Sequence, residues 1–182
     1  LHFHLLPNVE QARASKIVAM ARAVLEPHRL AAPLYLISAA PFETAMADVN
    51  TRVSTVVFRR FIMRVAERIA EQRQCLALVT GESVGQVASQ TLQNISMISR
   101  ATALPILRPL IAFDKAEIVA AAQRLGTYDL SIQPYRDPCS IHARNPATSA
   151  DLGEVERVET EIGIADLLET TLHNYVDKVW IN

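Results

Sequence analysis

One short apolar run is followed by a segment with two glycines and several polar side chains, a pattern suited to holding an anionic ligand. The segment reads Thr80-Gly81-Glu82-Ser83-Val84-Gly85-Gln86. Glycines permit tight turns and close backbone approach, and free amides at the start of a helix attract anions. Gln90 lies one helical turn further on, where its amide could contact an adenine edge or a ribose. The segment matches neither of the common phosphate-binding glycine motifs. An ordinary strand-to-helix connection is therefore the alternative interpretation.

Four arginines on one predicted helix offer positive charge that could serve the same ligand. Arg60, Arg64 and Arg68 are spaced four residues apart and therefore share one helix face. That face can be a solvated stripe with surface salt bridges or a track for phosphates. Arg59 lies about 100° around the helix from Arg60 and could point into a ligand cleft instead. A surface salt bridge is the alternative for Arg59 as well.

The two cysteines have opposite surroundings. Cys75 begins an apolar run, and we expect it to be a buried, inert core residue. Cys139 lies in a polar loop between Asp137-Pro138 and Ser140, with Arg136 before it and His142 and Arg144 after it. Nearby cations favour the thiolate, which is the form that attacks or accepts sulfur. An unreactive loop cysteine is the alternative.

Two other polar pairs receive structural interpretations. His2 and His4 would face the same side of a strand, but no third metal ligand accompanies them in the sequence. We interpret both as polar residues that end a strand, and we predict no metal site. Asp114 and Glu117 have the spacing of a helix N-cap and its third residue, which favours a helix start over an acid–base pair.

The hydrophobic pattern predicts the elements that must position these residues. Short apolar runs, typical of strands, lie at 1–6, 34–37, 75–79 and 104–107, and helical spacing is found over 11–25, 55–71, 83–97, 115–125 and 154–172. We expect loops at 41–50 and 127–148. This alternation predicts an α/β fold with a parallel sheet and helices on both faces. Ligands bind such sheets at the carboxyl ends of the strands. This rule selects five segments: His2–His4, Ser38–Phe42, Thr80–Gln86, Arg108–Leu110 and the loop around Cys139.

Composition excludes several classes of protein. The 182 residues carry a net charge of −1 and are 50% hydrophobic, which excludes a disordered chain. The sequence contains no run of about 18 apolar residues, so it predicts no membrane span, and no secretory signal is visible. Two distant cysteines favour a reducing cytoplasm. Residues 1–110 have a basic excess and residues 151–182 an acidic one, so a nucleic-acid partner suits only the first part, although solvated helix faces explain the charges equally.

Three segments together resemble the tRNA 4-thiouridine synthetases, sulfurtransferases that also serve thiamine-thiazole synthesis in some bacteria. The first runs from Leu78 through Gly81-Glu82-Ser83 to Leu92. The second is Leu107-Arg108-Pro109-Leu110-Ile111 followed by Asp114-Lys115, and the third runs from Gly126-Thr127-Tyr128 to Asp137-Pro138-Cys139. The resemblance covers about residues 1–160. It implies a PP-loop ATP pyrophosphatase domain, of the adenine nucleotide α-hydrolase type, over residues 1–150, followed by an acidic helical extension at 151–182.

The resemblance also implies a reaction and a set of site residues. The family uses ATP, with Mg²⁺, to adenylate a tRNA uridine, and a persulfide then displaces AMP to leave 4-thiouridine. By position, Cys139 matches the sulfur-transfer cysteine. The nucleotide contacts match a set of five residues: His2, Phe3, Arg59, Gly81 and Gln90. The implied partners are tRNA, a cysteine desulfurase as sulfur donor, and a second copy in a homodimer.

This sequence also departs from the family pattern. The family's phosphate-binding loop, S-G-G-x-D-S, and the first strand before it would precede Leu1, and neither is in the sequence. Many relatives have two adjacent cysteines where this chain has Pro138-Cys139. We therefore expect residues 1–182 alone to be inactive. A PP-loop ligase for another substrate, such as a thiazole precursor, and a non-catalytic nucleotide-binding module are the alternatives.

Overall fold

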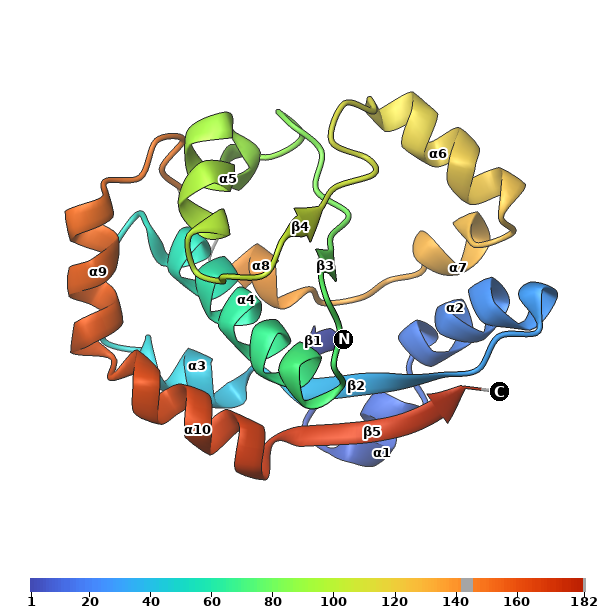
Figure 1. Ribbon diagram of the computed structural model, residues 1–182, viewed down its shortest axis with the longest axis horizontal. Coiled ribbons are helices and arrows are strands. Elements are labelled where there is room, and N and C mark those ends of the chain that lie inside the picture. The colour runs from blue at the N-terminus through green and yellow to red at the C-terminus, as the bar shows by residue number, and fades with distance from the viewer. Residues whose placement is uncertain (142–145, 182) are drawn as a thin grey trace.

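The computed structural model describes residues 1–141 and 146–181 and folds them as two small β-sheets beside one long helix (Figure 1). The first sheet has the strand order β1-β2-β5, and the second consists of β3 and β4. The strands are β1 (His2–His4), β2 (Ala32–Ser38), β3 (Leu78–Val79), β4 (Ile106–Leu107) and β5 (Val176–Ile181). His142 and Arg144, which we expected to favour a thiolate at Cys139, lie outside the described residues.

Strand pairing confirms the α/β fold class and adds one antiparallel strand. β1 runs parallel to β2, with His2 opposite Leu36, and β3 runs parallel to β4. β5 is antiparallel to β2, with Val176 opposite Ile37. The sequence interpretation left 176–181 unassigned, although Val, Trp and Ile in this segment favour a strand. Its partner is more than 130 positions away, and local patterns do not identify such a partner.

The structure contains the main helices that the sequence predicts, but many of their boundaries differ. They are α1 (Val9–Arg13), α2 (Lys16–Leu25), α3 (Ala40–Ala45), α4 (Ser54–Gln72), α5 (Leu92–Ser99), α6 (Lys115–Arg124), α7 (Tyr128–Ser131), α8 (Pro138–Ile141), α9 (Leu152–Glu161) and α10 (Ile164–Asn174), with 3₁₀ turns η1 (Glu26–His28) and η2 (Ala88–Gln90). None of the helices in the described part of the chain is both long and apolar enough to cross a membrane.

Helix α4 forms the centre of the core because its apolar residues recur at helical spacing. Phe58 and Phe61 are almost completely buried, and Phe3 of β1 packs edge-on against Phe58 with ring centroids 5.7 Å apart. Phe42 of α3 contacts the rings of both Phe58 and Phe61. Each such aromatic side chain contributes about 1.5–3 kcal/mol by burial. This cluster fixes α4 against the first sheet, and Leu78 extends it to the second.

Helices cover both faces of the first sheet, as expected for an α/β fold. Ile37 faces the core formed with α4, whereas its neighbour Leu36 faces the opposite side and packs with Ala12 and Val18 of α1 and α2. Successive side chains of a strand point to opposite faces, so both faces of β2 are buried.

Several loop and strand expectations are wrong. Residues 41–45 of the first expected loop lie in α3, and Pro41 is tolerated there because it stands in the first turn. The second expected loop, 127–148, contains α7 and α8. The expected strand 75–79 is reduced to two residues, and Cys75 is exposed rather than buried. Its neighbour Leu76 is 86% exposed, because β3 pairs only with the two-residue β4 in this structure.

Three expected helices are interrupted, two of them near a glycine in the left-handed region. The helix predicted over 11–25 is divided into α1 and α2 at residues 14–15. The helix predicted over 83–97 begins only at α5, after an irregular segment in which Gly85 has φ +79°. The final helix predicted over 154–172 is divided into α9 and α10 at Gly163, whose φ is +60°. Left-handed backbone ends a right-handed helix, and glycine adopts it without a steric penalty.

Residues 151–181 contribute to the same core as the preceding residues. Val155 and Val158 of α9 are completely buried in the cluster around α4, and β5 extends the first sheet. The expected boundary at residue 150 stays a prediction about domain organisation.

Candidate functional site

A cleft of about 640 Å³ lies at the carboxyl end of β3, between α4, the glycine-containing segment and α8. Its walls include four of the six residues that the sequence selected: Arg59, Gly81, Gln90 and Cys139. The size falls within the range of about 300–1,000 Å³ that is typical of small-molecule sites. The carboxyl end of a parallel strand is also where ligands bind in α/β sheets.

Arg59 reaches the cleft from α4 and is held there by a buried carboxylate. Its Nη2 donates to Glu82 Oε1 at 2.6 Å, and its Nη1 lies 3.4 Å from Ser89 Oγ. The Arg59 side chain is 13% exposed and that of Glu82 only 2%. Arg59 therefore presents a fixed positive charge at the cleft wall, as expected of a side chain turned away from the Arg60 face.

Gln90 has a buried oxygen that lacks a partner. The turn from Gly85 to Gln90 is closed by a hydrogen bond from the Gly85 N–H to the Gln90 carbonyl at 3.0 Å. Within the described residues, no donor reaches Gln90 Oε1, although this atom is buried. An unpaired buried acceptor costs about 1–3 kcal/mol. A ligand amino or hydroxyl group in the cleft would supply the missing donor.

Cys139 lines the cleft as a protonated thiol. Its N–H donates to Asp137 Oδ1 at 2.7 Å. Burial and the Asp137 charge together raise the pKa of the Cys139 thiol to about 12, while Arg59 acts in the opposite direction. Among the described residues, burial and Asp137 outweigh Arg59 and favour the neutral thiol. The expectation that Arg136, His142 and Arg144 favour a thiolate stays a prediction, because His142 and Arg144 lie outside the described residues.

Asp137 supplies a test of this electrostatic balance. Asp137→Asn keeps an oxygen that can accept from the Cys139 N–H but removes the negative charge. We expect the pKa of the Cys139 thiol to fall, and its alkylation to become faster at neutral pH, while burial keeps the pKa above the ordinary value. The pH profile of iodoacetamide modification at Cys139, read by mass spectrometry, measures this. An unchanged profile would show that the Asp137 charge does not act on the thiol.

His2 and Phe3 do not line the cleft. His2 Nε2 lies 2.8 Å from the Tyr135 hydroxyl, and burial lowers the pKa of His2 to about 4, so the imidazole is neutral at pH 7. The Phe3 side chain is in the core. Tyr135 precedes Asp137 by two residues, so His2 contacts the segment that carries Cys139 without facing the cleft itself. The nucleotide roles assigned to His2 and Phe3 stay predictions.

The remaining candidates have structural partners. Arg60 and Arg64 both bind Glu159, and Arg68 binds Glu169, so these three arginines form salt bridges rather than an open phosphate track. His4 Nδ1 accepts from the Leu6 N–H at 3.2 Å. Across residues 1–141 and 146–181, no three His, Cys, Asp or Glu side chains are grouped as a metal site would require.

The capping prediction at Asp114 is confirmed. Asp114 accepts from the Glu117 N–H, and the Glu117 carboxylate accepts from the Asp114 N–H, both at 2.8 Å. This reciprocal pair is a capping box, and it assigns both residues to the start of α6.

The sequence interpretation placed Glu82 and Arg108 in motifs at strand ends but gave neither residue a role of its own. Arg108 Nε donates to Glu82 Oε2 at 2.5 Å, and the Thr80 hydroxyl donates to the same oxygen at 3.0 Å. A charged residue between glycines at a strand end was a usable signal, but its two arginine partners lie 23 and 26 positions away.

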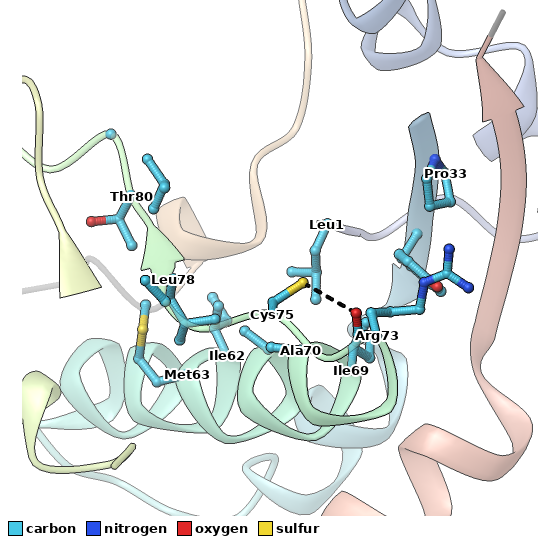
Figure 2. A pocket seen from close by; sticks show the side chains of 15 residues that line it. Leu1, Pro33, Ile62, Met63, Ile69, Ala70, Arg73, Cys75, Leu78 and Thr80 are labelled. Carbon is cyan, nitrogen blue, oxygen red and sulfur yellow. Dashed lines mark hydrogen bonds between the residues drawn. The ribbon is translucent and has the colours of Figure 1, made fainter. Parts of the chain in front are cut away.

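An apolar groove of about 660 Å³ adjoins the cleft and separates the two sheets. Figure 2 shows Pro33 of β2 on one side, Leu78 of β3 on the other, and Ile62 and Ala70 of α4 between them. The Leu78 and Thr80 N–H groups donate toward β4, so the Val79 N–H points toward the groove by strand alternation. The groove thus lies between Leu1 and β2 of the first sheet and the free edge of β3.

Comparison with known proteins gives consistent results. Residues 1–164 match the family described as thiamine biosynthesis protein (ThiI). A probable tRNA sulfurtransferase of Finegoldia magna is 40% identical over 176 residues, covering 96% of this chain and 45% of that protein. One from Moorella thermoacetica is 37% identical over 179 residues, with the same two coverages.

A solved structure agrees at the level of the fold. The crystal structure of a 4-thiouridine synthetase–RNA complex with bound ATP has a TM-score of 0.83 and 34% identity, covering 92% of this chain and 44% of that one. The chain thus spans about half the length of the relatives it matches. With a family match over residues 1–164 and this fold, the chain belongs to the ThiI family.

Proposed function

We propose that this chain forms most of the catalytic domain of an ATP-dependent tRNA sulfurtransferase that makes 4-thiouridine. The observation that carries the proposal is the convergence of Arg59, Gly81, Gln90 and Cys139 on one cleft. This convergence supports a nucleotide site with a sulfur-transfer residue beside it. The relatives named tRNA sulfurtransferases, and the similar structure with ATP and RNA, support the same reaction.

The residues present fit an adenine nucleotide. Arg59 offers a fixed cation for phosphate oxygens, and the unpaired Gln90 Oε1 needs a donor such as an amino or ribose hydroxyl group. Mg²⁺ would accompany ATP mainly through the phosphates, since it usually retains waters and substrate oxygens as ligands. Nucleotide contacts of His2 and Phe3 are proposed from the family resemblance alone, because neither residue lines the cleft.

The proposed reaction has three bond exchanges, at the α-phosphorus of ATP, at C4 of the uridine and at sulfur. Uridine O4 attacks the α-phosphorus of ATP, and pyrophosphate leaves. A persulfide sulfur then bonds to C4 while the C4–O bond breaks, and AMP leaves with that oxygen and the electron pair. In the C4–S–S link, a second thiol attacks the sulfur that is not bonded to C4. The S–S bond breaks, the C4-bound sulfur remains as that of 4-thiouridine, and the two thiols are joined in a disulfide. Cys139 would either hold the persulfide or supply the attacking thiol.

The apolar groove supports a place for the family's phosphate-binding segment. A strand laid between β1 and β3 would pair with both outer edges and join the two sheets into one. Its carboxyl end would then lie beside Gly81, where a following loop could hold phosphates. We propose that a segment of this kind completes the site, and that residues 1–182 alone are inactive.

ATP binding tests this completion. Residues 1–182 are expected to bind ATP at least about tenfold more weakly than the same chain preceded by the strand and an S-G-G-x-D-S loop, because phosphate contacts are lost. Isothermal titration calorimetry on both proteins measures the difference. Equally tight binding by residues 1–182 would contradict the expectation and favour a nucleotide-binding module without catalysis.

The function itself is tested in cells. The gene that encodes this chain is placed in a strain that lacks its own 4-thiouridine synthetase, and the nucleosides of its tRNA are analysed by mass spectrometry. We expect 4-thiouridine to reappear. Its absence, together with rescue of growth without thiamine, would indicate a ligase for a thiazole precursor. A cysteine desulfurase as donor, a homodimer and a cytoplasmic location are further proposals that rest on family membership.

A further inference from the structure

The Glu82 carboxylate is the most completely enclosed charged group at the cleft. Glu82 is 2% exposed, and three side chains donate to it: Arg59 to Oε1, and Arg108 and Thr80 to Oε2. A buried carboxylate is costly unless it is paired, so these contacts must be present when the site is folded. Glu82 thereby ties α4 to the ends of β3 and β4 at the point where Arg59 enters the cleft.

The two arginines that contact Glu82 have different surroundings. Arg108 lies outside the cleft wall, where its Nη2 also donates to Ser99 Oγ at 2.8 Å. Arg59 lines the cleft, and among the described residues its guanidinium uses only two of its five N–H donors, one of them at 3.4 Å.

We propose that Glu82 is a positioning residue that holds the Arg59 guanidinium toward the phosphates of the nucleotide. Arg108 and Thr80 keep Oε2 paired, so Arg59 can turn its remaining donors to a ligand without leaving the buried carboxylate alone. This inference rests on the proposed nucleotide site. It assigns to Glu82 no contact with the substrate, only the orientation of the residue that makes it.

The test compares ligands that do and do not carry phosphate, using the full-length product of the gene that encodes this chain. Glu82→Gln is expected to weaken ATP and AMP binding about tenfold or more and to leave adenosine binding nearly unchanged, because only phosphate reaches Arg59. In the Arg59→Ala background, Glu82→Gln should add little further loss of ATP affinity. KM for ATP should rise more than kcat falls.

Matched variants separate positioning from folding. Glu67→Gln alters another hydrogen-bonded carboxylate, which accepts from the Thr102 hydroxyl and the Ala103 N–H outside the cleft, and ATP affinity should not change. Glu82→Asp keeps the charge but is too short to reach both arginines, so its ATP affinity should lie between those of wild type and Glu82→Gln. If Glu82→Gln does not fold, the same comparison with Glu82→Asp decides.

The possible outcomes distinguish this inference from the proposed function. Failure of the wild-type protein to bind ATP would overturn the proposed function and this inference with it. If wild type binds ATP and Glu82→Gln binds it equally well or more tightly, only the positioning role is wrong. Equal losses for ATP and adenosine, or losses that add to those of Arg59→Ala, would likewise reject positioning in favour of a general structural role.

Discussion

Replacing Cys139 by serine is expected to reduce 4-thiouridine in tRNA to an undetectable level while leaving ATP affinity almost unchanged. A serine hydroxyl can neither carry a transferable sulfur nor attack one, so sulfur transfer to the uridine cannot be completed. The substitution replaces one atom by a smaller one in the cleft wall, and Arg59 and Gln90 keep their positions. Mass spectrometry of tRNA nucleosides from a complemented deletion strain, with calorimetry of ATP binding, measures both quantities.

Cys75→Ser is the matched control. Cys75 is exposed and lines the apolar groove rather than the cleft, where its thiol lies 3.9 Å from the Arg73 carbonyl oxygen. We expect full thiolation with this variant. Full thiolation by Cys139→Ser would show that the cysteine assignment is wrong. Loss in both variants would point to a general requirement for thiols rather than to transfer at Cys139.

The features that the sequence predicted well depend on residues close together in the chain. The start of α6 follows from Asp114 and Glu117, three positions apart, and α4 is found within one residue because its apolar residues recur regularly. The parallel pairing of β1 with β2 follows from the strand–helix–strand order. Local signals therefore establish the fold class and the elements that carry the cleft.

The errors concern contacts between distant residues. Cys75 has an apolar neighbourhood in the sequence, yet it is exposed because β3 has a pairing partner on one edge only. The partners of Glu82 likewise converge from two other elements. Burial and long-range ion pairs decide these cases, and neither can be derived from local composition.

The same limit applies to the arginine face of α4, whose role became clear only through Glu159 of α9. Arg60 donates to Glu159 through Nε at 2.7 Å and Nη2 at 3.2 Å, and Arg64 donates through two N–H groups, both at 2.8 Å. Arg60 also donates to the Met97 carbonyl oxygen at 2.8 Å. Arg60 and Glu159 are each 5% exposed, so this ion-pair cluster is inside the protein and joins residues after 151 to the central helix.

Glu159→Gln is therefore expected to lower the free energy of unfolding by about 3–5 kcal/mol, because it leaves two arginines without their anion. Urea denaturation at pH 7 measures the loss. Glu161→Gln on the same helix is the control, since Glu161 and Arg157 form an exposed pair at 3.4 Å. An exposed pair of this kind contributes about 0.5 kcal/mol or less. Equal losses of unfolding free energy in the two variants would show that the buried ion-pair cluster stabilises the protein no more than the exposed pair does.

The pH dependence of the same two variants separates charge from packing. Burial acts to raise the pKa of Glu159, but hydrogen bonds and charges from Arg64 and Arg60 outweigh it and hold the pKa below the ordinary value. A carboxyl with a depressed pKa in the folded state stabilises the protein above its unfolded-state pKa of about 4.3, and this contribution disappears as the pH falls through the folded-state pKa. Because glutamine does not titrate, the difference in unfolding free energy between wild type and Glu159→Gln should narrow as the pH falls below about 4.3. A difference that is the same at pH 7 and pH 3 would mean that side-chain packing, rather than the Glu159 charge, joins α9 to α4.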